Sequence, residues 1–117
     1  MTPAMKILTF QASALAVGTL MIATVADMAK AAPPPAAAVQ IANFTFKNPV
    51  VTVKPGTTVT WTNADDIPHT VVSKDGLFRS KVLDSGDRFS FTFAKPGQFG
   101  YFCSIHPHMT GMVIVTA

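Results

Sequence analysis

The chain has 117 residues, of which 49% are hydrophobic and 13% are charged, and its formal net charge is +3. This length suits a single domain. The mild charge, without a cluster of Lys or Arg, gives no reason to expect a nucleic-acid partner. The single cysteine, Cys103, excludes a framework of intrachain disulfides.

The first segment with a composition of its own is residues 7–26, an apolar run without a charge that follows Lys6. A positive start, an apolar stretch and small residues in an A-x-A pattern are typical of a secretory signal peptide. We therefore predict a signal peptide over residues 1–31 and export to the periplasm, with cleavage after Ala26 or Ala29 as alternatives. An uncleaved membrane anchor is the competing interpretation, because the run approaches the roughly 20 residues that span a bilayer.

The rest of the chain begins with the sequence APPPAAA over residues 32–38, which predicts a stiff, extended tether. From residue 39 onward, short alternating runs are broken by turn residues roughly every eight to twelve positions, a pattern typical of an all-β sandwich or barrel. No segment after the tether has helical periodicity with caps. We predict one β domain over residues 39–117.

The predicted strands follow from the alternation of apolar and polar side chains. They are residues 39–46, 50–53, 57–63, 69–73, 88–94, 98–103 and 111–116. The clearest is 88–94, in which Phe89, Phe91 and Phe93 are predicted to point inward. The aromatic residues are interpreted as core packing.

The segment that carries chemistry lies between the last two predicted strands. From Cys103 through His106 to Met109 it offers a thiol, an imidazole and a thioether. A lone thiol in an exported chain is an inert buried group, half of an intermolecular disulfide, or a metal ligand. Cys with His and Met favours copper, and two His and one Cys with a long axial Met form the blue-copper arrangement.

A second imidazole has to come from outside this loop, and His69 is the only candidate there. It starts a predicted strand, so it can meet the loop at one end of a sandwich. Alternation places Cys103 on the same face as Phe99 and Tyr101, so its sulfur is predicted to point inward. His108 is predicted to face solvent and is the alternative to His106.

Other chemistries explain this set of residues less well. A catalytic Cys–His pair accounts for neither Met109 nor His69. Structural zinc needs a fourth strong ligand in place of a thioether, and a binuclear copper centre needs a second cysteine. Each residue taken singly is more often packing or surface, so the copper prediction depends on their joint occurrence.

The segment 101–115 resembles the carboxy-terminal copper loop of cupredoxins. The two-residue spacing between His106 and Met109, with Pro107 after the His, is most similar to amicyanins, whereas plastocyanins and pseudoazurins have longer spacings. Further matches to the family are residues 53–56, 59–63 and 68–69. The resemblance covers about residues 39–117 and implies a cupredoxin-like Greek-key β-sandwich of about seven to eight strands.

The resemblance also implies the role of each ligand: His69, Cys103 and His106 are equatorial and Met109 is axial. Many relatives carry Asn after the first ligand His, where it ties two loops together. Here that position is Thr70, whose hydroxyl is expected to bond near Cys103 instead.

The function implied is an exported carrier of single electrons with one type 1 copper ion, and not an enzyme. Amicyanin resemblance implies an amine dehydrogenase as electron donor and a c-type cytochrome as acceptor. The mature form is expected to be a monomer that is not embedded in a membrane. Electrons are expected to pass the edge of His106, through a small patch that suits transient partners. The expected patch consists of Ile67, Pro68, Pro107 and His108.

Two other classes of function use the same fold. A copper-binding or delivery protein of the cell envelope has the same ligands but exchanges its metal readily. Multicopper oxidases and nitrite reductases need further His ligands, and this chain has three His in all.

Overall fold

The computed structural model describes residues 34–117, so the predicted signal peptide over residues 1–31 lies outside the described range. Every regular element within that range is a strand, and no helix there is long and apolar enough to cross a membrane. The strands are β1 (Ala36–Ala42), β2 (Thr45–Phe46), β3 (Val50–Val53), β4 (Thr57–Asn63), β5 (Val72–Ser73), β6 (Arg88–Phe93), β7 (Gly97–Phe102) and β8 (Thr110–Val115).

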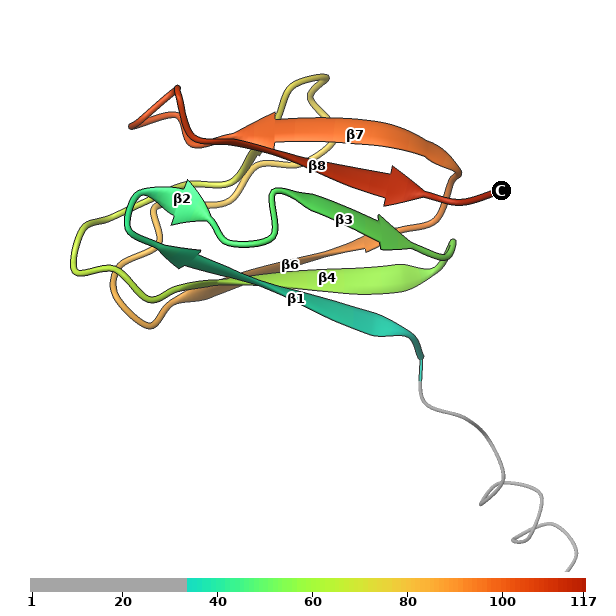
Figure 1. The fold of residues 1–117 in the computed structure, drawn as a ribbon, viewed down its shortest axis with the longest axis horizontal. Helices are drawn as coiled ribbons and strands as arrows, with labels where there is room; N and C mark the ends of the chain where they lie inside the picture. Colours follow the sequence, from blue (N-terminus) through green and yellow to red (C-terminus); the bar gives the residue numbers. More distant parts are fainter. Residues whose placement is uncertain (1–33) are drawn as a thin grey trace, which may run out of the picture. The chain divides into compact units, whose positions relative to one another are not determined.

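The strands form two four-stranded sheets, ordered β2-β1-β4-β6 and β3-β8-β7-β5 (Figure 1). Strands β1 and β4 pair in parallel, as do β3 and β8, and the other pairs are antiparallel. Neighbours in a sheet are therefore often distant in sequence, as a Greek-key sandwich requires. The predicted β-sandwich is confirmed.

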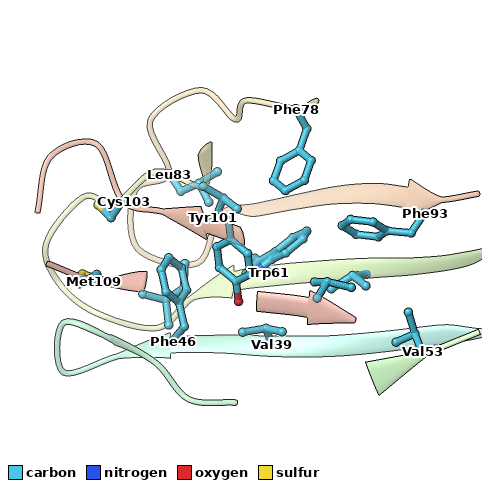
Figure 2. Close-up of a cluster of buried hydrophobic side chains, with 14 of the residues drawn as sticks. Val39, Phe46, Val53, Trp61, Phe78, Leu83, Phe93, Tyr101, Cys103 and Met109 are labelled. Atoms are coloured by element: carbon cyan, nitrogen blue, oxygen red, sulfur yellow. The ribbon is translucent and has the colours of Figure 1, made fainter. Parts of the chain in front are cut away.

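The core lies between the two sheets because alternate side chains of each strand point inward (Figure 2). In β4 both Val59 and Trp61 are fully buried, and in β6 Phe93 is buried while Phe89 and Phe91 are partly buried. The inward direction predicted for the three phenylalanines is confirmed. Each fully buried large apolar side chain contributes roughly 1.5–3 kcal/mol relative to an exposed one, so this core holds the strand ends in place.

The amino-terminal part of the domain differs from the sequence expectation in two ways. Residues 36–38, predicted as part of a tether, pair with β4 through Ala36↔Thr58 and the two following positions. The prediction failed there because alanine is a weak strand former, and the pairing depends on backbone groups. The predicted first strand also turns back at Asn43 and Phe44, so β1 and β2 form a hairpin.

The predicted strand over residues 69–73 is shorter than expected. Only Val72 and Ser73 form β5, which pairs with β7. His69 instead makes an isolated two-way bridge with Leu83, with its N–H 3.1 Å from the Leu83 carbonyl and the reverse bond at 2.8 Å. This bridge fixes the backbone of His69 without placing it in a sheet.

Candidate metal centre

Three connecting segments meet at one end of the sandwich, at the left of Figure 1. They are the β1–β2 turn, the β4–β5 connection that contains His69, and the β7–β8 loop that contains Cys103 and His106. The β7–β8 loop is closed by its own backbone. The Cys103 N–H donates to the Met109 carbonyl at 3.1 Å, and the Met109 N–H donates to the His106 carbonyl at 2.9 Å. Both loop ends are held by paired strands, so the loop is short and constrained.

The donor atoms of His69, Cys103 and His106 all lie within 4.8 Å of one another. The Cys103 Sγ is 3.8 Å from the Nδ1 atoms of both His69 and His106. A metal ion typically lies about 2.0–2.3 Å from nitrogen and sulfur ligands, so these three atoms could all bind one ion placed between them.

The orientation of His69 is determined by Asp65. The His69 ring is fully buried, and its Nε2 lies 2.8 Å from Asp65 Oδ2. Donation from Nε2–H to this carboxylate leaves Nδ1 with a free lone pair that faces the cysteine sulfur. The backbone N–H of Phe44 also donates to Asp65 and holds the pKa of that carboxyl below its usual value, so Asp65 is ionised and can accept both bonds.

The sulfur of Cys103 is buried and lies among hydrogen-bond donors. Burial raises the pKa of the thiol, but the Thr70 backbone N–H, at 3.4 Å from Sγ, and the imidazoles of His69 and His106 outweigh it. The resulting pKa is lowered to about 6. A large part of the thiol is therefore thiolate at neutral pH, which is the form that binds metals.

Thr70 makes the hydrogen bonds that the sequence led us to expect of its hydroxyl. Its Oγ1 lies 2.7 Å from Ser104 Oγ and accepts a bond of 2.7 Å from the Ser104 backbone N–H. The same oxygen is 3.8 Å from Cys103 Sγ. Thr70 thus joins the β4–β5 connection to the β7–β8 loop directly beside the sulfur.

The other loop residues singled out from the sequence, Met109, His106 and His108, differ in how far they are buried. Met109 is buried at the same end of the core as Cys103, as Figure 2 shows. His106 is half-buried and reaches the surface. His108 is exposed, with its ring centroid 6.5 Å from that of His106, and is not one of the three clustered donors.

Two residues beside the centre were not found from the sequence. Asp65 stands four residues before His69, a spacing that carries little information outside a helix. Phe44 contacts the rings of both His69 and His106 from the β1–β2 turn. The alternation of Phe44 with Phe46 predicts a continuous strand here and gives no sign of the turn.

Comparison with known proteins identifies the family. The family model for a cupredoxin-like domain matches residues 12–115, so the chain belongs to the cupredoxin-like family. Its curated relatives include amicyanin-alpha of Methylorubrum extorquens, 37% identical over 88% of this chain and 86% of the relative. The amicyanin of Paracoccus versutus is 38% identical over 71% of this chain and 67% of the relative.

Solved structures agree with this assignment. A purple cupredoxin from Nitrosopumilus maritimus is 35% identical with a TM-score of 0.64, over 68% of this chain and 99% of that one. The amicyanin structure from Paracoccus versutus is 37% identical with a TM-score of 0.65, over 72% of this chain and 84% of that one. A copper-containing nitrite reductase from Thermus scotoductus is 35% identical with a TM-score of 0.68, over 75% of this chain and 24% of that one.

The donor set fits the metal of this family. A thiolate of lowered pKa and two imidazole nitrogens that converge on one point are ligands suited to both copper oxidation states. Both the family and this donor set therefore indicate one copper ion as the cofactor.

Proposed function

We propose that this protein is an exported carrier of single electrons that uses one type 1 copper ion. In this proposal His69, Cys103 and His106 would hold the copper ion, with the Met109 thioether as a weaker fourth ligand. The observation that carries the proposal is the preformed triangle of one sulfur and two Nδ1 atoms at the end of a packed sandwich. A copper ion held by these residues would supply the one-electron redox chemistry.

The hydrogen bonds around the centre support this role. Electron transfer is fast when the donor atoms move little between the two oxidation states of the metal. Asp65 is hydrogen-bonded to the His69 ring, and the Cys103 N–H donates a hydrogen bond to the Met109 carbonyl. A hydrogen bond between the hydroxyls of Thr70 and Ser104 joins the two loops. Each bond opposes a shift of the ligands toward the tetragonal geometry that Cu(II) otherwise prefers.

The surface around His106 supports a transient contact with redox partners. His106 is half-buried, the Phe44 side chain that contacts its ring is 42% exposed, and the preceding residue, Ile105, is 46% exposed. A small apolar surface around an exposed ligand edge suits complexes that must dissociate quickly. Similarity to amicyanins leads us to include an amine dehydrogenase as donor and a c-type cytochrome as acceptor in the proposal, with the periplasm as the location.

A copper-delivery protein of the envelope is the second candidate function. It would need a centre that opens for metal exchange, whereas His69 and Cys103 are fully buried and Met109 is 3% exposed. A catalytic role is less well supported, because this chain spans only 24% of the similar nitrite reductase. Burial of the donors therefore favours the electron carrier.

The proposal is tested by adding one equivalent of Cu(II) to the protein and recording its visible and EPR spectra. We expect an intense blue absorption and a small parallel hyperfine splitting, both lost in Cys103→Ala. His108→Ala is the matched control and should keep both, while His106→Ala should not. A pale protein with an ordinary tetragonal spectrum that Cys103→Ala does not change would rule out the type 1 site.

Electron transfer itself requires a second measurement, because a delivery protein could also be blue. We expect fast and reversible cycling at an electrode, together with slow loss of copper to a chelator. Rapid loss of copper with sluggish redox cycling would favour the delivery function.

A further inference from the structure

The β1–β2 turn is strained at the residue nearest the metal centre. Asn43 and Phe44 are the two loop residues of this hairpin and have φ values of 56° and 55°. Two-residue hairpin loops with both residues at positive φ strongly prefer Asn followed by Gly. Asn43 follows this preference, but Phe44 stands where Gly is favoured, and a bulky side chain there is a true outlier. The strain requires a compensating interaction.

The compensating interaction comes from Asp65. Its Oδ1 accepts a hydrogen bond of 2.6 Å from the Asn43 N–H, and its Oδ2 accepts a hydrogen bond of 2.9 Å from the Phe44 N–H. Oδ2 also lies 2.8 Å from His69 Nε2. One carboxylate therefore holds the strained turn and one of the histidines together.

The strained turn directs the Phe44 ring at the two histidines. The Phe44 centroid is 5.6 Å from that of His69 and 5.0 Å from that of His106, and both ring pairs are nearly perpendicular at 89°. These are favourable edge-to-face contacts. The described residues show no other aromatic pair for Phe44, which lies outside the core cluster and is 42% exposed. Core packing therefore does not explain why a phenylalanine occupies this position.

We propose that Phe44 is a positioning residue of the metal centre. The Asp65-bound turn holds its ring against both imidazoles, restricts rotation of the half-buried His106 ring and thereby slows the departure of copper. This inference rests on the proposed function, because it assumes that His69 and His106 are ligands. Phe44 does not itself bind the metal.

The test uses Phe44→Gly, which removes the ring and also relieves the positive-φ strain. The rate of Cu(I) transfer to an excess chelator is measured well below the unfolding temperature of both apoproteins. Because Phe44→Gly loses two aromatic contacts, we expect it to transfer Cu(I) on the order of tenfold faster than the wild type. We also expect an apoprotein melting temperature that is equal to or above that of the wild type. Asp65→Asn, which weakens the anchor but keeps the ring, should accelerate transfer less.

Leu77→Ala is the matched control. Leu77 is an exposed apolar side chain, 47% accessible, in a different region lined by Phe91 and Phe99. Its replacement should leave the transfer rate unchanged. A rate for Phe44→Gly within about twofold of the wild-type rate would overturn the proposal.

A second readout does not depend on bound copper. In the apoprotein, nuclear Overhauser contacts should connect the Phe44 ring protons with the rings of both His69 and His106, and their absence would also overturn the proposal. Failure of the proposed function is seen separately, as a wild-type protein that does not turn blue. A blue wild type whose rate equals that of Phe44→Gly would refute the role of Phe44 only.

Discussion

In the middle of the sandwich, the rings of Trp61 and Tyr101 lie 5.2 Å apart, and both side chains are fully buried among apolar neighbours. At the metal end, the side chains of Asp65, His69 and Thr70 are held mainly by hydrogen bonds. Apolar packing tolerates changes of similar volume, whereas a hydrogen-bonded centre depends on the identity of each atom. Substitutions in the middle should therefore change stability, and substitutions at the end should change the properties of the copper.

The largest effect on stability is expected for Trp61→Ala. Loss of a fully buried Trp typically costs about 3–5 kcal/mol, because the cavity closes only partly. Thermal or denaturant unfolding of the apoprotein measures this. Trp61→Phe should cost much less and should keep the blue spectrum. A large change in the spectrum of the folded Trp61→Phe protein would mean that the two regions are not independent.

Gly111→Ala tests the boundary between the two regions. A Cβ atom at Gly111 would clash with the phenol group of Tyr101, which is fully buried and cannot move aside freely. We expect a loss of about 1–3 kcal/mol in unfolding free energy. Gly86→Ala is a useful comparison, because its cost comes from positive φ without a steric contact. Equal stability of Gly111→Ala and wild type would show that Tyr101 is mobile.

The stability of the apoprotein should depend on pH through Cys103. Its pKa is lowered from 9.0 to about 6, so between these values the folded state binds fewer protons than the unfolded state. This contribution is fully present above the unfolded pKa, and it is lost as pH falls through about 6. Stability should therefore rise from pH 6 to 9 in the wild type. The same melting series for Cys103→Ser should lack this rise, and an identical slope would contradict the assignment.

The smallest change is expected for Thr70→Val. The substitution removes the hydroxyl between Ser104 and Cys103 and should cost about 1 kcal/mol in stability. It also removes the hydrogen bond from the Thr70 hydroxyl to the Cys103 sulfur. Because this hydrogen bond stabilises the more negative reduced state of the centre, we expect its loss to lower the reduction potential. Thr58→Val is the control, because it removes an exposed hydroxyl bonded to Thr92 at 2.8 Å. A potential that shifts equally in both variants would contradict a local effect.

Most strands of the sandwich can be predicted from the sequence because alternation in a strand is a local property. The inward faces of β4 and β6 follow from a period of two residues, and both are observed. Alternation failed at Phe44 and Phe46, which are two residues apart but lie in a turn and a strand. Ala36–Ala38 gave no signal, since their pairing with β4 uses only backbone groups.

The sequence by itself determined the all-β character of the domain and the copper ligand candidates, because strand alternation and the Cys103–His106–Met109 spacing are local patterns. It also named His69, since few histidines were available. Only the tertiary structure decided how Asp65 orients that ring and how Phe44 contacts both histidines. The contacts of Phe44 with Asp65 and with the two histidines join segments about twenty to sixty residues apart, and their distances depend on how the two sheets pack.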